Sequence, residues 1–142
     1  MDFNEQLLQS WLKLTTVINN DRLVSNLPFN EMVIFRHLLQ SEHHALTATD
    51  LCSLTTMQKS QMNRTLTAME DKGLVKRIKD AKDKRKTYVY LNEEAMDIYT
   101  NEHQKIIDLI DRLIEKVGTE QAKQVLAVFN SVAEVAAKEL EK

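Results

Sequence analysis

Residues 72–91 contain the pattern that most restricts how this chain can fold. A helix-like stretch stops at Gly73, which supplies the left-handed conformation that commonly ends a helix. Two short strands follow, and the second places its side chains on alternate faces, Val89 and Leu91 on one and Tyr88 and Tyr90 on the other. The connection 80–86 is charged and lacks Gly, so we expect a flexible ribbon tip rather than a tight hairpin. The sequence therefore predicts a helix that leads directly into a two-stranded ribbon.

The same part of the chain concentrates the positive charge. From Met57 to Leu91 there are ten Lys and Arg residues against four Asp and Glu residues, a net charge of +6. The other residues carry 9 basic and 17 acidic side chains, a net charge of −8. A local basic segment in an otherwise acidic chain indicates a surface that meets a polyanion. The alternative is a solvated hairpin with no partner.

Composition indicates a helical, globular protein. With 142 residues, 43% hydrophobic and 28% charged, the chain can bury a core as one domain. Two Gly and one Pro favour long helices over many turns. We expect no membrane span, because no apolar run approaches the ~20 residues that one needs. The N-terminus lacks a signal-peptide pattern and the chain has one cysteine, which together favour a cytoplasmic protein without a disulfide.

Apolar residues at helical spacing predict helices on both sides of the ribbon. Before the ribbon, helices are predicted over residues 5–24, from Pro28 to about Ser41, over a short segment with Leu51 and Leu54, and over a longer segment that ends at Lys72. Thr47 or Thr49 is expected to cap the short segment. After the ribbon, a helix of about 25 residues is predicted from Asn92, and a last helix follows a stop at Gly118 and a cap at Thr119. Residues 42–45 are predicted to be a polar connection, and Thr55-Thr56 interrupts the apolar pattern before the longer segment.

A short helix, a turn, a second helix and a basic ribbon together form a winged helix-turn-helix. Met62, Leu66 and Met69 share one stripe of the second helix and are expected to anchor it to the core. The opposite face is rich in amide, hydroxyl and cationic groups, which read base edges and hold phosphates. Its members are Lys59, Ser60, Asn63 and Thr67, with Gln58, Gln61 and Arg64 alongside. This helix therefore suits the major groove of double-stranded DNA.

The ribbon, or wing, is expected to lie over the neighbouring DNA backbone or minor groove. Its cations at the tip are Lys82, Lys84, Arg85 and Lys86. Asp83 lies two residues before Arg85 and can pair with it, which would orient its guanidinium group.

The first and last helices hold more apolar residues than one buried stripe requires. The extra apolar residues are Ile107, Ile114, Leu126, Ala133 and Val135. A long isolated helix cannot bury so wide a surface, so we expect packing against a second chain, with folding back onto its own domain as the alternative. The predicted organisation is a single mainly α domain over 1–142 with a small β-wing. Residues 1–26 and 96–142 form its dimerisation region, and residues 28–95 form its DNA-binding lobe.

In this order the motifs resemble those of the MarR (multiple antibiotic resistance regulator) family of bacterial transcription factors. The residues that carry the resemblance are Asn63-Arg64-Thr65-Leu66, Met69-Glu70-Asp71-Lys72-Gly73-Leu74-Val75-Lys76-Arg77, Asp83-Lys84-Arg85 and Val89-Tyr90-Leu91. Leu27 to Phe35 and Gly118-Thr119-Glu120 are similar to the second helix and to the entry of the last helix. The resemblance therefore spans nearly the whole chain.

The resemblance implies an obligate homodimer, joined through the first and last helices, that binds a pseudo-palindromic operator. Repression by operator occupancy is the simplest expectation, with activation as the alternative, and no cofactor is expected. By position, Ser60, Gln61, Asn63 and Arg64 would contact the major groove, and Arg85, held by Asp83, would enter the minor groove. It also implies a possible small-molecule effector between the dimer helices and the DNA-binding lobe. The six methionines with Trp11, Phe29 and Phe35 could line such a pocket, although ordinary core packing explains the same composition. Two features depart from the family pattern: Asn92-Glu93-Glu94-Ala95 replaces a usual Thr and Gly, and Asn63 replaces a frequent Thr.

Other chemistry is weakly indicated. His37, Glu42, His43, His44 and His103 suggest a zinc sensor, but their spacing is not that of a zinc site, so we expect non-ligating histidines. Cys52 suggests a thiol sensor, but no exposure or thiolate-stabilising cation is evident, so a structural cysteine is the expectation. The sequence has no enzyme motif. A winged helix that docks an acidic protein instead of DNA is the other alternative, and a steep salt dependence of duplex binding would separate the two.

Overall fold

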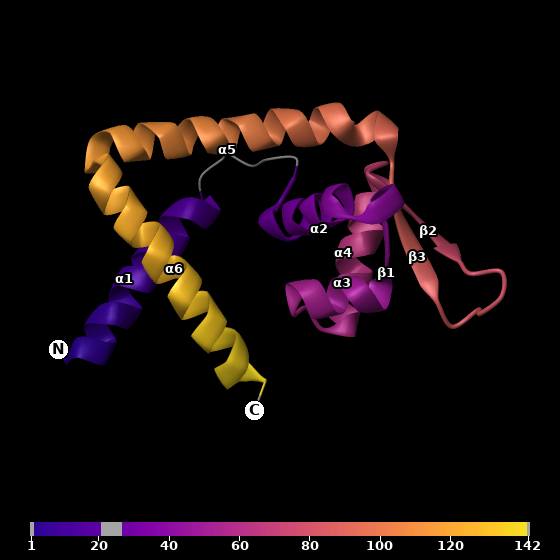
Figure 1. The fold of residues 1–142 in the computed structure, drawn as a ribbon, viewed down its shortest axis with the longest axis horizontal. Helices are drawn as coiled ribbons and strands as arrows, with labels where there is room; N and C mark the ends of the chain where they lie inside the picture. The colour runs from indigo at the N-terminus through magenta and orange to yellow at the C-terminus, as the bar shows by residue number, and fades with distance from the viewer. Residues whose placement is uncertain (1, 21–26, 142) are drawn as a thin grey trace. The chain divides into compact units, whose positions relative to one another are not determined.

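The computed structural model describes residues 2–20 and 27–141. They fall into two compact units, one ending at His103 and the other beginning at Gln104. In chain order the elements are α1 (Phe3–Asn20), α2 (Phe29–Gln40), the 3₁₀ helix η1 (Glu42–His44), β1 (Ala45–Thr47), α3 (Ala48–Thr55), α4 (Lys59–Asp71), β2 (Val75–Lys79), β3 (Thr87–Leu91), the 3₁₀ helix η2 (Glu93–Ala95), α5 (Met96–Val117) and α6 (Thr119–Leu140), as Figure 1 shows. The predicted class, mainly α with a small β-wing, is confirmed.

Helices α2, α3 and α4 and a three-stranded sheet enclose the core of the first unit. Burial of their apolar side chains is the main driving force for this packing. The largest fully buried side chains are Phe35, Leu27, Ile34, Leu38, Leu51, Met62, Leu66, Met69, Leu74 and Val89. Phe35 also stacks on Tyr99 from the start of α5, with ring centroids 4.7 Å apart. The first turns of α5 are thereby tied to this core.

Helix boundaries follow the chemistry of the flanking residues. Pro28 immediately precedes α2, so the predicted start of this helix at Pro28 is one residue too early, and the Pro28 carbonyl accepts a hydrogen bond from the Met32 amide at 2.9 Å. The Thr47 hydroxyl accepts a hydrogen bond from the Asp50 amide at 3.0 Å, so Thr47 and not Thr49 caps α3. The predicted helix at 5–24 is present as α1 up to Asn20, and positions 21–24 lie outside the described residues.

The turn between α3 and α4 is built from two threonines. The Thr55 hydroxyl donates to the Leu51 carbonyl at 2.6 Å, and Thr56 ends α3 in the left-handed conformation with φ of 60°. These residues hold α3 and α4 as the two helices of a helix-turn-helix, as predicted.

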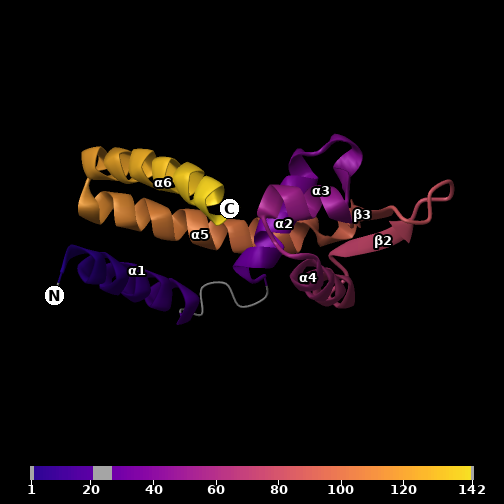
Figure 2. The same cartoon turned by 90° about the horizontal axis from the view of Figure 1, so that it is seen from below.

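The sheet is antiparallel in the order β1-β3-β2. Strand β1 was not predicted, because residues 42–45 were interpreted as a polar connection and three residues are too few to show an alternating pattern. Its strand conformation depends on pairing with β3, where Leu46 lies opposite Val89. The predicted faces of β3 are confirmed, since Val89 and Leu91 are buried and Tyr90 is exposed. In Figure 2 the β2–β3 connection projects beyond the helices of this unit.

The base of the wing is closed by contacts between its two ends. Gly73 has φ of +76° and its amide donates to the Glu70 carbonyl at 2.9 Å, which ends α4 as predicted. The Asn92 side-chain amide donates to the Gly73 carbonyl at 2.9 Å, and the Asn92 backbone amide donates to the Leu74 carbonyl at the same distance. The residue that departs from the family pattern at this point therefore clamps the wing in addition to starting the next helix.

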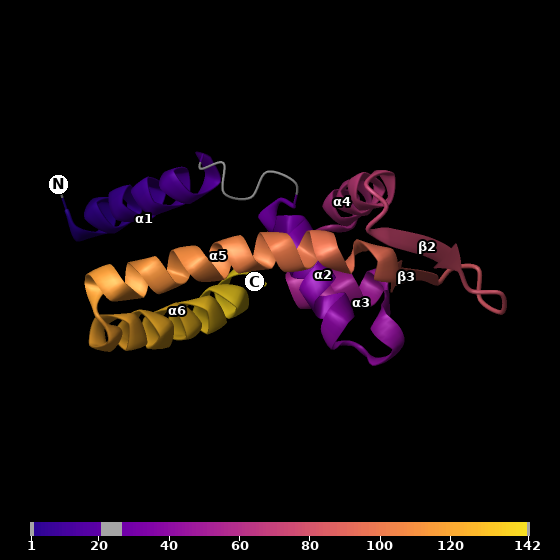
Figure 3. The same ribbon diagram turned by 90° about the horizontal axis from the view of Figure 1, so that it is seen from above.

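Beyond the wing, α5 leads into α6 (Figure 3), and Gly118 is the residue between them. Gly118 has φ of +96° and itself precedes the first helical residue of α6, so the predicted cap at Thr119 is wrong by one position. Glycine is favoured here because residues with a side chain rarely adopt this backbone φ. Within the described residues, none of the helices combines the length and the apolar composition of a membrane crossing.

The apolar side chains of the terminal helices are largely exposed in the single chain. Exposed apolar residues are Phe3, Leu7, Leu8, Trp11, Leu12, Leu14 and Val17 on α1, and Val125, Leu126, Val128, Phe129, Val132, Val135 and Leu140 on α6. Monomeric proteins rarely expose contiguous apolar surfaces of this kind.

Candidate nucleic-acid interface

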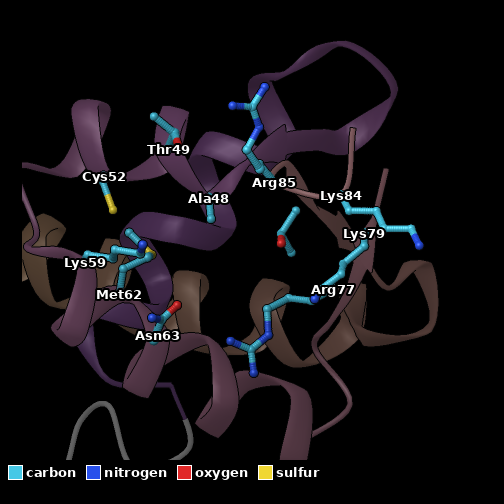
Figure 4. A pocket seen from close by; sticks show the side chains of 11 residues that line it. Ala48, Thr49, Cys52, Lys59, Met62, Asn63, Arg77, Lys79, Lys84 and Arg85 are labelled. Carbon is cyan, nitrogen blue, oxygen red and sulfur yellow. The ribbon is translucent and has the colours of Figure 1, made fainter. Parts of the chain in front are cut away.

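A cleft of about 700 Å³ lies between α3, α4 and the wing of the first unit (Figure 4). Its lining residues are Ala48, Thr49, Cys52, Lys59, Met62, Asn63, Arg77, Lys79, Lys84, Arg85 and Thr87. Five of these side chains are Lys or Arg, and none of the described residues that line it is an Asp or a Glu. The cleft is therefore an electropositive groove between a helix and a ribbon.

Helix α4 forms one wall of this cleft and is amphipathic as predicted. Met62, Leu66 and Met69 are buried on the core side. Lys59, Ser60, Asn63 and Arg64 are exposed, Gln58 is exposed just before the helix, and Gln61 is half-buried. Lys59 and Asn63 line the cleft directly, whereas Ser60, Gln61 and Arg64 are on α4 outside its lining. The helix thus presents amide, hydroxyl and cationic groups along a solvent-facing surface.

The wing forms the opposite wall. Lys84 and Arg85 line the cleft, while Lys82 and Asp83 are elsewhere on the tip. The predicted pair is present, because Arg85 Nε lies 3.3 Å from Asp83 Oδ1 and the Arg85 backbone amide donates to the same oxygen at 3.1 Å. The Arg85 side chain is nevertheless 92% exposed, so its guanidinium group is held at one end and open to solvent.

Hydrogen bonds organise the wing tip. The Asp80 amide donates to the Lys86 carbonyl and the Lys86 amide donates to the Asp83 carbonyl, both at 3.0 Å. The charged connection is therefore a hydrogen-bonded turn with exposed cations, and composition did not predict these hydrogen bonds.

The MarR family model matches residues 25–86, which include α2, α3, α4, the strands β1 and β2, the wing tip, and every cleft residue except Thr87. The part of the chain that holds the cleft matches the MarR family. The family suggested by the sequence motifs is thereby confirmed. No curated protein sequence matches this chain.

Solved MarR-type structures share the fold. Sco3205, a MarR family transcriptional regulator from Streptomyces coelicolor solved in complex with DNA, has 21% identity and a TM-score of 0.79, with 94% of this chain and 92% of that chain covered. AdcR, the adhesin competence repressor of Streptococcus pyogenes, has 23% identity and a TM-score of 0.65, with 100% of each chain covered. NadR, solved in complex with 4-hydroxyphenylacetate, has 24% identity and a TM-score of 0.64, with 96% and 93% covered. These likenesses extend the MarR fold to α1, α5 and α6.

One residue of the predicted reading face, Thr67, has its hydroxyl group hydrogen-bonded within the protein. The Thr67 hydroxyl donates to the Asn63 carbonyl at 2.9 Å and accepts a hydrogen bond from Arg77 at 2.9 Å. Arg77 was not among the predicted site residues, although it lines the cleft. The β2–β3 register could have indicated it, since residue 77 shares a sheet face with the buried Val89.

The candidate sensor residues lie at separate places in the MarR fold. His44 Nδ1 lies 2.8 Å from Glu93 Oε1, and the His103 ring stacks on Tyr99. Among the residues that the structure describes, no group of three or more His, Cys, Asp or Glu side chains is arranged to hold a metal. Cys52 is half-buried and lines the cleft, and its expected structural role stays a prediction.

Proposed function

We propose that this protein is a cytoplasmic transcriptional regulator that binds double-stranded DNA as a homodimer and represses transcription by occupying a pseudo-palindromic operator. The observation that carries the proposal is the cleft, whose two walls combine a solvent-facing polar helix with a basic wing. Residues on α4 would contact base edges while residues on the wing would contact phosphates. The proposed DNA-contacting residues are Gln58, Lys59, Ser60, Gln61, Asn63, Arg64, Lys82, Lys84 and Arg85, with Asp83 orienting Arg85.

The exposed polar groups of α4 and of the wing tip support duplex DNA over an acidic protein as the partner. A helix with exposed amides and hydroxyls matches the donor and acceptor pattern of the major groove, for which an acidic protein surface offers no equivalent. Arg85 projects from the tip with most of its surface exposed, as an arginine that enters a narrow minor groove must. The DNA complex of Sco3205, which has the same fold, agrees with this assignment.

The exposed apolar surfaces of α1 and α6 support the homodimer. A second copy of the chain would bury residues such as Trp11 and Phe129, which are otherwise in water. Two copies related by a twofold axis would place two reading helices on half-sites roughly 10 base pairs apart.

A small-molecule effector is part of the proposal, as in the NadR complex with its hydroxyphenylacetate. Of the three aromatic residues first considered for an effector pocket, Phe35 is fully buried against Tyr99 and is better explained by core packing. Trp11 and Phe29 are exposed and remain candidates for effector contact. Such a ligand would lower DNA affinity if it bound the DNA-free conformation more tightly.

Selection of bound fragments from randomised duplex DNA tests the proposed function. We expect enrichment of an inverted repeat that a dimer binds, and the repeat would identify target promoters. If no sequence is enriched and the purified protein instead captures an acidic polypeptide, the protein-interaction alternative replaces the DNA-binding one.

A further inference from the structure

We propose that Arg77 is a positioning residue for DNA reading. It sets the geometry between the reading helix α4 and the wing strand β2, and it does not contact DNA itself. This inference rests on the proposed DNA-binding function. It concerns how the two walls of the cleft are held at the spacing that the duplex requires.

The contacts of Arg77 join one wall to the other. Arg77 lies on β2, and its Nε donates to Glu70 Oε1 at 2.6 Å. Its terminal nitrogen contacts the same carboxylate and also donates to the Thr67 hydroxyl at 2.9 Å. Glu70 and Thr67 lie one turn apart on α4, so a single guanidinium group bridges the strand to two successive turns of the reading helix. Figure 4 shows Arg77 on the wall of the cleft among the other cations.

The chain of bonds continues to a residue that is proposed to read bases. The Thr67 hydroxyl, which accepts from Arg77, donates to the backbone carbonyl of Asn63 at 2.9 Å. Arg77 therefore fixes the helix turn that presents the Asn63 side chain to the cleft. A shift of this turn would move the Asn63 amide relative to the wing cations.

Charge and exposure distinguish Arg77 from the cations that are proposed to hold phosphates. The side chain of Arg77 is 25% exposed and its charge is compensated by Glu70, whereas the side chain of Arg85 is 92% exposed. A guanidinium group that makes charge-assisted bonds at Nε and at one terminal nitrogen has fewer free donors for a phosphate. It would also have to leave Glu70 to bind one.

The Glu70→Gln variant gives opposite results for the two roles. If Arg77 bound a phosphate, removing the competing carboxylate would free its charge and raise DNA affinity. If Arg77 positions α4, Glu70→Gln loosens the bridge, and we expect operator affinity to fall about fivefold to tenfold, an effect of the size of one net hydrogen bond. Arg77→Gln should cause a similar loss, and the double variant should be no worse than either single variant, because the two residues act as one unit.

Salt dependence provides the second readout. Loss of one phosphate contact reduces the slope of log K against log salt by about 0.9. We expect Arg77→Gln to weaken binding with the slope unchanged, and Arg77→Lys to restore part of the affinity because it keeps a charge beside Glu70. Glu31→Gln is the matched control, since its partner Lys72 ties the end of α4 to α2 and not to the wing. This control should lower the free energy of unfolding and leave the operator affinity of the folded protein unchanged.

The possible results separate this inference from the proposed function. A wild-type protein that binds no duplex overturns the proposed function, and with it this role of Arg77. A wild-type protein that binds, together with a Glu70→Gln variant that binds equally well or more tightly, overturns only the positioning role. A reduced salt slope for Arg77→Gln also overturns it, because Arg77 would then be a phosphate contact.

Discussion

The ammonium group of Lys72 contacts both carboxylate oxygens of Glu31, at 2.9 and 3.0 Å, across 41 positions of the sequence. Glu31 is buried in the first turn of α2, and Lys72 is the residue that ends α4. The pair therefore ties α2 to the residue that follows α4 and contributes to the stability of the core, whereas Arg77 ties α4 to the wing.

Removing the lysine should destabilise the fold. We expect Lys72→Met to lower the free energy of unfolding by about 1–3 kcal/mol, because it leaves a buried carboxylate without its cation. Urea denaturation monitored by circular dichroism measures this change. Lys76→Met, at an exposed position of β2, is the control and should change stability by less than about 0.5 kcal/mol. Equal stability of the two variants would contradict the structural role of the Lys72–Glu31 pair.

The end of α4 gives a second stability prediction. Gly73 has φ of +76°, and a Cβ added there would have no atom within 4 Å, so a Gly73→Ala variant suffers only from its backbone conformation. We expect a loss of about 1 kcal/mol, and a smaller loss for Gly73→Asn because Asn adopts this conformation more readily. Thermal unfolding of both variants checks the order, and an Ala variant as stable as the wild type would contradict it.

The helices and the wing could be predicted because their signals are local. The stripe of Met62, Leu66 and Met69 fixes the buried face of α4, and Gly73 fixes its end. Strand β1 could not be predicted in this way, because its conformation arises from pairing with β3 more than 40 positions later.

The sequence also predicted part of the candidate site. Lys59, Asn63, Lys84 and Arg85 were predicted from charge and spacing, and the structure places all four on the cleft. The bridge from Arg77 to Glu70 and Thr67 depends on side-chain geometry across two elements, which no local pattern encodes. Sequence alone therefore assigned the Thr67 hydroxyl to DNA, although it is bonded within the protein. The DNA contacts themselves stay predictions.

The wing tip gives a prediction about DNA affinity. We expect Arg85→Ala to weaken binding to all duplex sequences alike, because the variant lacks the Arg85 contact with the DNA backbone or minor groove. The slope of log K against log salt should fall by about 1. Lys76→Ala also removes one positive charge, but Lys76 lies on the face of the sheet opposite to Arg77 and the cleft. This control should leave the slope nearly unchanged. Fluorescence anisotropy at several salt concentrations measures both. If Arg85→Ala binds like the wild type at physiological salt, the assignment of the wing is wrong.

Asn63 should affect specificity more than affinity. Its exposed side chain lines the cleft, and a side-chain amide can bond two atoms of one adenine edge. We expect Asn63→Ala to lose about 1–3 kcal/mol of discrimination at one base pair of each half-site, with little change in non-specific binding. Repeating the selection from randomised DNA with this variant should relax that position alone. An unchanged consensus would mean that Asn63 does not read a base.

The terminal helices give a prediction about assembly. Leu126→Glu and Val132→Glu place a charge on the exposed apolar surface of α6, and either should shift the protein from dimer to monomer. Lys123→Glu, at a polar exposed position of the same helix, should leave the dimer intact. Sedimentation velocity over a range of concentrations distinguishes these states. A wild-type protein that is monomeric at all concentrations would contradict the proposed dimer.

The most direct test of the central claim is the affinity of the wild-type protein for its selected operator as a function of salt concentration. The proposed cleft predicts that log K falls linearly with log salt, with a slope that corresponds to several phosphate contacts. It also predicts binding to the operator at least about 10³-fold tighter than to unrelated duplex DNA. A salt-independent interaction, or equal affinity for every duplex, would contradict the account of this protein as a sequence-specific DNA-binding regulator.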